Sequence, residues 1–514
     1  MEHYYEFKYV KMNGEDFFTI VLLPQRNGSY PCVVCRSPYV KNTVTATDDS
    51  VALECYNNFR LWLDRGYAVV FQHCRGQGKS SGAFVPYVYE REDGLELRAW
   101  IRSREFYNGE LYLLGASYTA SLHYATAPFE EDIYGAVFDV QDSERYRLWY
   151  RNGQMRKGHA NWHFGLYKDK SGLDKRFDMR SFSQLPIKEL SKKCLGERAD
   201  DFEQMLEAPS PTHEFWKTRY GGAETKDALS DADIPILLTT GYNDFYVGGV
   251  FDMWNRMNRQ TRDKSALLVS PYNHGDGYNR EIGISFPNGQ KRAAFGDDYR
   301  IVWLDNVRKG TPLPYKKGSV AYYRTFENIW GYDFYGRKTR SMNISLGQGK
   351  DSFTYDPSDP PAFRGEGLVA EEFLERKDVL SIFTPDFLDD TFVLGKMKMK
   401  LFVSTNCEDT SFYVRISLKK SDYTYVLRHD ITSLCYQLGD YEAGSVAELE
   451  FSFDEYAFLV KQGESLRVDI SSTDDNVYVC HTNRKGEYYT QNDCLVAKNT
   501  VYLEKSYLTI PIEE

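Results

Sequence analysis

The sequence contains no apolar run that approaches the roughly 18 residues a bilayer-spanning helix needs, which argues against a transmembrane protein. It also has no excess of positive charge, because 63 Lys and Arg stand against 74 Asp and Glu and give a net charge of −11. The basic residues are dispersed rather than gathered into blocks. We therefore expect no nucleic-acid partner and no binding to anionic membranes.

Signs of secretion are missing as well. The first residues, MEHYYEFKYV, lack the charged-then-apolar order of a signal peptide. The nine cysteines are an odd number scattered between positions 32 and 494, which is not the pattern of a secreted disulfide framework. We predict a cytoplasmic protein with reduced thiols.

Aromatic residues are abundant, with 40 Tyr, 31 Phe and 8 Trp. This composition favours β structure and aromatic-lined pockets. The length of 514 residues is enough for two or three domains, each with its own core.

The first third of the chain alternates apolar runs with helical patterns at 51–65 and 91–103. Such alternation predicts a mostly parallel sheet with helices on both faces, built from residues 1–141 and 232–315. The predicted strands are 17–23, 31–35, 67–72, 111–114, 135–140, 234–240 and 265–270.

Two other segments have different patterns. Residues 142–231 are rich in Arg, Lys, Trp, Tyr and His, with short helical periodicities and no clear strand, and we predict a helical cap inserted in the core. Residues 316–514 contain short alternating stretches separated by turn signals, for example 397–403, 410–418 and 466–471. This pattern predicts an all-β sandwich of the jelly-roll type.

The stretch LYLLGASYTA, at 111–120, places Ser117 where a buried strand becomes a helix. Gly115 and Ala120 are small, as required where a nucleophilic serine sits on a sharp strand-to-helix turn. In such a turn the backbone N–H of Tyr118 can stabilise an oxyanion. The alternative is that Ser117 is only a helix cap.

A serine nucleophile needs an imidazole to take its proton and a carboxylate to orient the imidazole. In this type of fold the carboxylate and then the histidine follow the serine along the chain, each after a later strand. Asp244 follows the strand at 234–240, and His274 follows the strand at 265–270. We expect Ser117, Asp244 and His274 to form a catalytic triad.

Two other motifs have the spacing of a redox or metal site, but their surroundings in the sequence argue against that role. Cys32 and Cys35 form a CxxC on a predicted strand, where residues three apart point to opposite faces. His159 and His163 have the spacing of zinc ligands on a helix, but Ala160 stands where a metalloprotease needs glutamate. We expect no metal and no cofactor.

Several ordered motifs along the chain resemble those of the cocaine-esterase-like (CocE/NonD) branch of the α/β-hydrolases. This branch is related to the Xaa-Pro dipeptidyl-peptidases and the α-amino-acid ester hydrolases. The resembling stretches are RSPYVKN (36–42), GYAVVFQHCRGQGKSSGAF (66–84), EDGLELRAWI (92–101), NGELYLLGASY (108–118), YDPSDPP (355–361), FTPDFLDDTFVLG (383–395) and GESLRVDISSTD (463–474).

The resemblance implies roles for individual residues. Ser117 would be the nucleophile, His274 the general base and acid, and Asp244 the orienting carboxylate. Tyr39, the tyrosine of RSPY, would donate its hydroxyl to the oxyanion beside the Tyr118 amide. Tyr246 matches an aromatic position that borders the acyl pocket in relatives.

We therefore predict a serine hydrolase that cleaves an ester or amide through an acyl-enzyme, with a small-molecule ester or short peptide as substrate. A carboxylesterase is favoured because the core begins almost at residue 1, whereas Xaa-Pro peptidases of the family often carry an additional N-terminal helical domain. The alternative is an Xaa-Pro dipeptidyl-peptidase or aminoacyl ester hydrolase, in which Asp142 and Glu144 would bind the α-amino group. An alternative of another class is a catalytically silent carbohydrate- or ligand-binding protein. The sequence does not indicate whether the protein forms a homo-oligomer.

Overall fold

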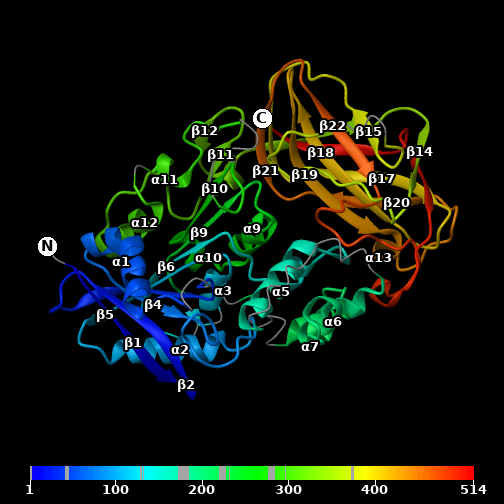
Figure 1. Ribbon diagram of the computed structural model, residues 1–514. Helices are drawn as coiled ribbons and strands as arrows, with labels where there is room; N and C mark the ends of the chain where they lie inside the picture. Colours follow the sequence, from blue (N-terminus) through cyan, green and yellow to red (C-terminus); the bar gives the residue numbers. More distant parts are fainter. Residues whose placement is uncertain are drawn as a thin grey trace. The chain divides into compact units, whose positions relative to one another are not determined.

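The computed structural model folds into two compact units (Figure 1). The first consists of Met1–Arg145, Trp216–Ser270 and Gln290–Ala321, and the second of Tyr146–Phe215, Pro271–Gly289 and Tyr322–Glu514. The structure describes residues 3–40, 45–124, 126–127, 130, 132–171, 185–218, 227, 229–230, 232–275, 284–295, 297–371 and 376–514. Within these residues, no helix is both long and apolar enough to cross a membrane.

One twisted sheet forms the first unit, with its strands coloured blue to green in Figure 1. The strands lie in the order β1-β2-β4-β3-β5-β6-β9-β10, and the chain then leaves the unit within β11 (Val320–Arg324). All pairs from β4 to β10 are parallel, whereas β1 and β2 are antiparallel to their neighbours. The strands are β1 (Tyr4–Met12), β2 (Glu15–Leu23), β3 (Tyr30–Ser37), β4 (Ala68–His73), β5 (Tyr107–Ala116), β6 (Ile133–Asp139), β9 (Ile236–Gly241) and β10 (Ala266–Ser270).

The mostly parallel α/β core predicted from the sequence is confirmed, together with its seven predicted strands. Parallel strands are buried on both faces, so they appear in the sequence as nearly continuous apolar runs. β9 and β10 are buried at every position. β1 was not predicted; it lies at the edge of the sheet, and three of its nine residues are charged.

Helices cover both faces of this sheet, as the contacts of β6 demonstrate. Asp139 accepts a hydrogen bond from Tyr299 of α12 (Tyr299–Lys309), whereas the neighbouring Phe138 packs on Tyr124 of α3 (Tyr118–Tyr124). Because successive strand residues point to opposite faces, α12 and α3 lie on opposite sides. The other helices that contact the sheet include α1 (Asp48–Asp64), α2 (Glu90–Arg102) and α9 (Val247–Arg256).

An antiparallel β-sandwich makes up most of the second unit, which confirms the predicted all-β C-terminal domain. The aromatic contact between Phe353 and Phe412, whose ring centroids are 6.2 Å apart, joins the two sheets. One sheet contains β13 (Thr339–Ser345), β14 (Lys350–Tyr355), β16 (Thr391–Gly395), β17 (Lys398–Thr405), β20 (Ala447–Ser452), β21 (Tyr456–Val460), β23 (Ala497–Tyr502) and β24 (Tyr507–Glu513). The other contains β15 (Leu380–Phe383), β18 (Ser411–Lys419), β19 (Thr424–Ser433) and β22 (Ser465–Ser471).

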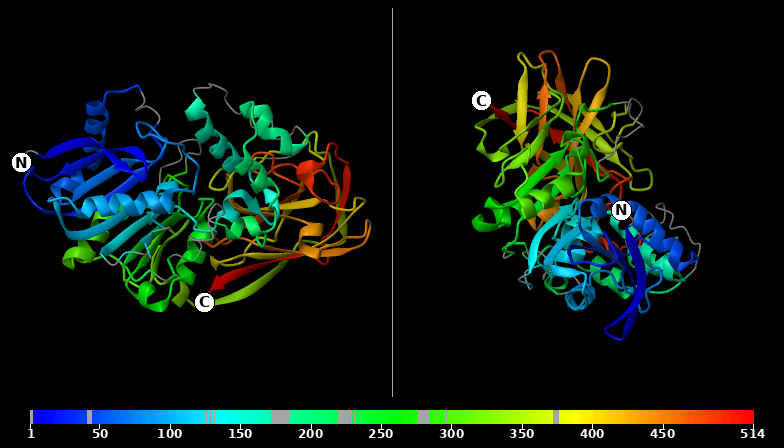
Figure 2. Two further views of the ribbon diagram at one scale, coloured as in Figure 1. Left: turned by 90° about the horizontal axis from the view of Figure 1, so that it is seen from below. Right: turned by 90° about the vertical axis from the view of Figure 1, so that its left-hand side faces the viewer.

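The predicted helical segment also belongs to this unit. Figure 1 and the left view of Figure 2 show its helices beside the strands of the sandwich. They are α4 (Arg145–Trp149), α5 (Lys157–Ser171), α6 (Leu190–Leu195) and α7 (Asp200–Leu206). Parts of the predicted cap, residues 172–184, 219–226, 228 and 231, lie outside the described residues.

A short hairpin, β7 (Tyr150–Arg151) and β8 (Gln154–Met155), interrupts the helices where no strand was predicted. Strands of two residues are too short to carry an alternating pattern. The turn between them is Asn152-Gly153, and both residues have positive φ, 47° and 76°. This dipeptide is typical of a two-residue hairpin turn, because both positions require φ above zero.

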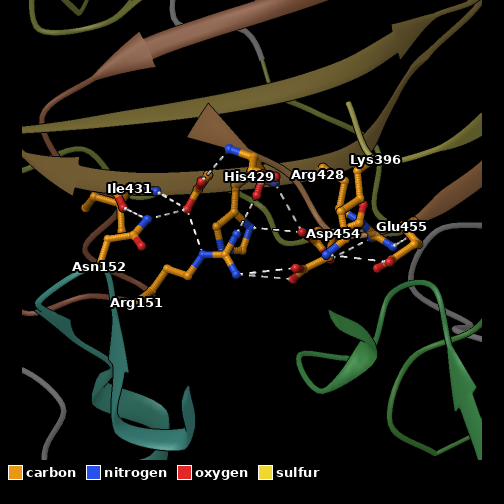
Figure 3. Close-up of polar contacts among 11 residues, drawn as sticks. Arg151, Asn152, Lys396, Arg428, His429, Ile431, Asp454 and Glu455 are labelled. Atoms are coloured by element: carbon orange, nitrogen blue, oxygen red, sulfur yellow. Dashed lines mark hydrogen bonds and ion pairs between the residues drawn. The ribbon is translucent and has the colours of Figure 1, made fainter. Parts of the chain in front are cut away.

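The hairpin contacts the sandwich through a cluster of polar side chains (Figure 3). Arg151 reaches Asp430, with Nε and Oδ1 2.7 Å apart, and Asp454, with Nη1 and Oδ1 3.3 Å apart. Its Nη2 donates to the carbonyl oxygen of Ser452 at 2.8 Å, and Asn152 donates to that of Ile431 at 2.9 Å. The positive charges of Arg151 and nearby arginines hold the pKa of Asp454 below its ordinary value. The helical segment is therefore joined to the sandwich by charge as well as by packing.

Replacing Arg151 with Met should destabilise the second unit by about 3 kcal/mol, because Asp430 is buried and would lose its cation. Urea unfolding followed by circular dichroism would measure this loss. Lys396→Met is the matched control: Lys396 is partly exposed and lies 3.5 Å from Glu455, so its loss should cost less than about 1 kcal/mol. Equal stabilities of the two variants would contradict the importance of the Arg151 contacts.

Asp474 is a second buried carboxylate of the sandwich, only 1% exposed. Its Oδ1 accepts the N–H groups of Phe363 and Asn476, both at 3.0 Å, and its Oδ2 accepts the hydroxyl of Tyr413 at 3.3 Å. Burial outweighs these bonds and raises the pKa of Asp474 from 3.8 to about 6. Between pH 3.8 and about 6, the Asp474 carboxyl is therefore protonated in the folded protein but ionised in the unfolded chain.

The raised pKa of Asp474 makes this group lower the stability as the pH rises from about 4 to about 7. Over that range, Asp474→Asn should gain about 3 kcal/mol relative to the natural chain, because the amide has no charge to bury. Urea unfolding at several pH values would measure the difference. Asp389→Asn, at an exposed position, should instead follow the natural chain at every pH. A pH-independent difference for Asp474→Asn would contradict the assignment.

Candidate active site

Ser117 lies between the last residue of β5, Ala116, and the first residue of α3, Tyr118. Its backbone has φ of +54°, and its N–H donates to the carbonyl oxygen of Asp139 at the end of β6, at 2.9 Å. A Cβ on Gly115 would lie 2.4 Å from the carbonyl oxygen of Thr119. Glycine at position 115 is therefore required for the helix to start directly at the end of the strand.

Two further residues with side chains have positive φ close to this turn in the first unit. Val140, directly after β6, has φ of +48°, and Tyr87, shortly before α2, has φ of +68°. Branched and bulky residues rarely adopt this conformation, which costs roughly 1–3 kcal/mol. Such backbone strain tends to gather at functional sites, where the surrounding structure enforces it.

The ring of Tyr118 is buried and its hydroxyl has two partners. It donates to the Glu90 carboxylate in the first turn of α2 and accepts the N–H of Tyr87 at 2.9 Å. Burial raises the pKa of both Glu90 and Tyr118. These bonds hold the start of α3 against the start of α2. The sequence analysis did not identify Glu90, because no local pattern links it to a residue 28 positions away.

Tyr39 lies in the loop that follows β3 and is 43% exposed. Its N–H donates to the Ser37 hydroxyl at 3.0 Å. The buried Arg36 ties this part of the chain to α2, since Nη1 donates to the Glu90 carbonyl oxygen at 3.2 Å. Burial raises the pKa of both Tyr87 and Tyr246, and Tyr39 adds to the rise of each, which means that the three phenols share one region of the first unit.

Asp244 is fully buried in the turn that follows β9. Its N–H donates to the carbonyl oxygen of Gly241 at 3.1 Å, and its Oδ1 accepts the N–H of Tyr246 at 3.0 Å. Tyr246 precedes α9, is 6% exposed and packs against the exposed Phe245 with ring centroids 4.2 Å apart. The turn thus fixes the carboxylate within a short polar loop.

His274 follows the end of β10 by four residues along the chain and is half-buried. It belongs to the second compact unit, whereas Ser117 and Asp244 belong to the first. Tyr272 beside it donates to the carbonyl oxygen of Phe286 at 3.2 Å. The first unit therefore brings Ser117, Tyr118, Tyr39, Asp244 and Tyr246 to the carboxyl-terminal edge of one sheet, and His274 follows the next strand of that sheet in sequence.

Two other histidines of the first unit, His73 and His123, are buried. Burial lowers the pKa of His73 to about 4 and that of His123 to about 3, so both are neutral at pH 7. In the helical segment, Nε2 of His163 lies 2.6 Å from Oδ2 of Asp201. Among the described residues, no group of three or more His, Cys, Asp and Glu side chains could hold a metal ion.

Comparisons with known proteins support this description of the chain. A model of the X-Pro dipeptidyl-peptidase (S15 family) matches residues 15–276, about half of the chain. A model of the X-Pro dipeptidyl-peptidase C-terminal non-catalytic domain matches residues 327–509. Cocaine esterase of Rhodococcus sp. (strain MB1 Bresler) is 23% identical over 531 aligned residues, which cover 90% of this chain and 89% of the esterase.

Solved structures share the whole fold at low sequence identity. An aminopeptidase from a marine sediment archaeon, Thaumarchaeota archaeon, has a TM-score of 0.82 at 17% identity and covers 100% of this chain and 97% of its own. An α-amino acid ester hydrolase has a TM-score of 0.82 at 16% identity, and the match covers 99% of this chain and 96% of the hydrolase. A CocE/NonD family hydrolase from Staphylococcus aureus has a TM-score of 0.69 at 16% identity, and the match covers 100% of this chain and 94% of that hydrolase.

The S15 model spans both strand ends that carry Ser117 and Asp244, and it reaches two residues beyond His274. The second model spans most of the antiparallel sandwich. The chain belongs to the CocE/NonD (S15) family of serine hydrolases, which is related to the X-Pro dipeptidyl-peptidases and the amino acid ester hydrolases.

Proposed function

We propose that this serine hydrolase is a carboxylesterase-like acyl hydrolase that works through an acyl-enzyme on Ser117. His274 acts as general base and then as general acid, and Asp244 orients it. The hydroxyl of Tyr39 and the N–H of Tyr118 stabilise the oxyanion.

The strand-to-helix turn at Ser117 is the observation that carries the proposal. The positive φ of Ser117 and the close approach of β5 and α3 at Gly115 are features of a nucleophile turn and are not needed by an ordinary helix cap. The side chain is half-buried rather than enclosed, so a substrate carbonyl can reach it.

The buried contacts around the turn support the oxyanion assignment. Transition-state stabilisation depends on donors that are already in position before the reaction. The bonds of the Tyr118 hydroxyl to Glu90 and to the Tyr87 N–H hold residue 118 and hence its amide. The half-exposed Tyr39 provides a phenol at the same edge of the sheet.

The reaction proceeds in two acyl-transfer steps. The Ser117 hydroxyl loses its proton to His274 and attacks the carbonyl carbon, and the tetrahedral oxyanion is held by the two donors. Collapse of this intermediate expels the leaving group, which takes the proton from His274. A water molecule then attacks the acyl-enzyme, again with His274 as base, and releases the acid and free Ser117.

An ester substrate is favoured over a peptide by the surroundings of Asp142. This buried carboxylate accepts the N–H of Glu144 at 2.9 Å, and a Cβ on Gly249 of α9 would lie 2.0 Å from its Oδ2. Asp142 is thus packed against α9, which makes it a poor receptor for a substrate ammonium group. The similarity to cocaine esterase along 90% of the chain also supports an ester.

A second candidate function is an Xaa-Pro dipeptidyl-peptidase or aminoacyl ester hydrolase. It is supported by the description of the matching family model and by the fold shared with an aminopeptidase and an α-amino acid ester hydrolase. The identities of 16–17% make the structural likeness an argument about fold alone.

The natural chain should hydrolyse p-nitrophenyl butyrate, and Ser117→Ala should lose this activity by at least about 10³-fold, because the acyl-enzyme cannot form. Initial rates on the ester and on alanyl-prolyl-p-nitroanilide would separate the two candidates. Turnover of the anilide rather than the ester would support the dipeptidyl-peptidase. Substantial ester hydrolysis by Ser117→Ala would refute the assignment of the nucleophile, and labelling by a fluorophosphonate would identify the serine that reacts instead.

Gly115→Ala should lower kcat for the ester by about a hundredfold, because the added methyl group collides with the backbone of Thr119 and displaces Ser117. Gly158→Ala in α5 is the matched control. A Cβ there meets no atom within 4 Å, and alanine favours a helix, so kcat should stay unchanged and stability should rise by up to about 1 kcal/mol. Full activity of Gly115→Ala would contradict the tight turn.

A further inference from the structure

Arg145, five residues beyond the end of β6, is a buried arginine without a carboxylate partner among the described residues. It is 3% exposed, and its Nε and Nη1 have no hydrogen-bond partner there. By contrast, the buried Arg415 of the sandwich binds Asp469, with Nη2 and Oδ2 2.7 Å apart, as well as Glu371. The guanidinium of Arg145 instead covers the ring of Tyr87, with Cζ 3.8 Å from the ring centroid.

Tyr87 in turn contacts Tyr118, the residue that follows Ser117 in the strand-to-helix turn. The Tyr87 ring centroid lies 4.8 Å from that of Tyr118, and its N–H bonds to the Tyr118 hydroxyl. Burial raises the pKa of both Tyr87 and Tyr246, and the positive charge of Arg145 opposes this rise in each. Arg145 is therefore linked through Tyr87 to Tyr118, the residue that follows Ser117.

A buried guanidinium without an anion is costly for the folded protein. Arginine cannot relieve the cost by losing its proton, because its pKa lies above about 12. Stacking on Tyr87 offsets part of it, by roughly 1–2 kcal/mol. Asp142, three residues before it in the chain, does not neutralise it, since its oxygens contact the Glu144 N–H and α9. Such a cation retains the capacity to bind a planar carboxylate through two parallel N–H donors.

We propose that Arg145 binds a carboxylate of the substrate, so that this enzyme prefers esters or amides that carry a carboxylate on the acyl chain or on the leaving group. This inference rests on Ser117 as the nucleophile. The same positive charge disfavours a substrate with a free α-ammonium group, which again argues for an esterase rather than an Xaa-Pro peptidase.

Two p-nitrophenyl esters of matched chain length test the preference: the monoester of adipate, which ends in a carboxylate, and the heptanoate, which ends in a methyl group. A third ester, heptanoate joined to a hydroxynitrobenzoate, carries its carboxylate on the leaving group and reports on which side of the carbonyl Arg145 acts. The natural chain should have a kcat/KM about ten- to a hundredfold higher for one of the two charged esters than for the neutral heptanoate, as expected for a hydrogen-bonded ion pair.

Arg145→Leu should abolish this preference, mainly through KM, so that kcat/KM for the charged esters falls to the value for the neutral heptanoate in the same variant. Circular dichroism would report whether the variant is folded. Arg145→Lys should keep part of the preference, because it retains the charge but not the planar fork. Arg259→Leu removes the same charge from an exposed site on α10 (Arg259–Asp263) and should leave the preference intact.

Calorimetric binding to Ser117→Ala separates this proposal from that of the nucleophile, because binding needs no turnover. The adipate monoester or the benzoate ester should bind to Ser117→Ala more tightly than the heptanoate, and the double variant with Arg145→Leu should lose the difference. Equal binding of all three esters, or a preference that survives Arg145→Leu, would overturn the role of Arg145 even if Ser117 is the nucleophile. Ester hydrolysis that survives Ser117→Ala would instead refute the nucleophile and leave the binding result for Arg145 standing.

Discussion

The close approach of β5 and α3 at Gly115 is the constraint on which the rest of the site depends. With no side chain at position 115, the helix begins directly where the strand ends, and Ser117 must adopt a positive φ to connect them. The next residue, Tyr118, then points into the core, where Glu90 and the Tyr87 N–H hold its hydroxyl. One steric requirement thus positions both Ser117, the proposed nucleophile, and the amide beside it, and it links α3 to α2.

Elements with a strong local pattern could be predicted from the sequence, and elements without one could not. The apolar runs at 67–72 and 234–240 correspond to β4 and β9 within two residues at each end, because parallel strands are buried on both faces. β1 escaped prediction because charged residues interrupt its sequence, YYEFKYVKM, so that it contains no continuous apolar run. The β7–β8 hairpin is too short for any periodicity, and only its Asn-Gly turn indicated it.

The same distinction applies to the site. Ser117 and Asp244 could be anticipated because both follow apolar strands, and the carboxyl ends of neighbouring parallel strands share an edge. Glu90 could not, since its importance comes from contacts between distant segments and it stands in no recognisable motif. Arg36 belongs to the RSPYVKN stretch, but nothing in that stretch indicates its bond to the Glu90 carbonyl oxygen. The positive φ of Tyr87 is equally hidden, because tyrosine has no intrinsic preference for that conformation and the surrounding fold imposes it.

Two arginines six positions apart illustrate how a protein divides charge between stability and binding. Arg151 finds Asp430 and Asp454 within the fold, so its interactions are complete before any ligand arrives. Arg145 finds only the face of Tyr87 among the described residues and keeps donors unused. A side chain whose donors are all paired within the fold cannot bind a substrate with them. A binding side chain must keep unpaired donors in the free protein, and these lower its stability. The strained backbone at Ser117 and the unsatisfied guanidinium over Tyr87 fit this second condition, and the paired charges of the sandwich fit the first.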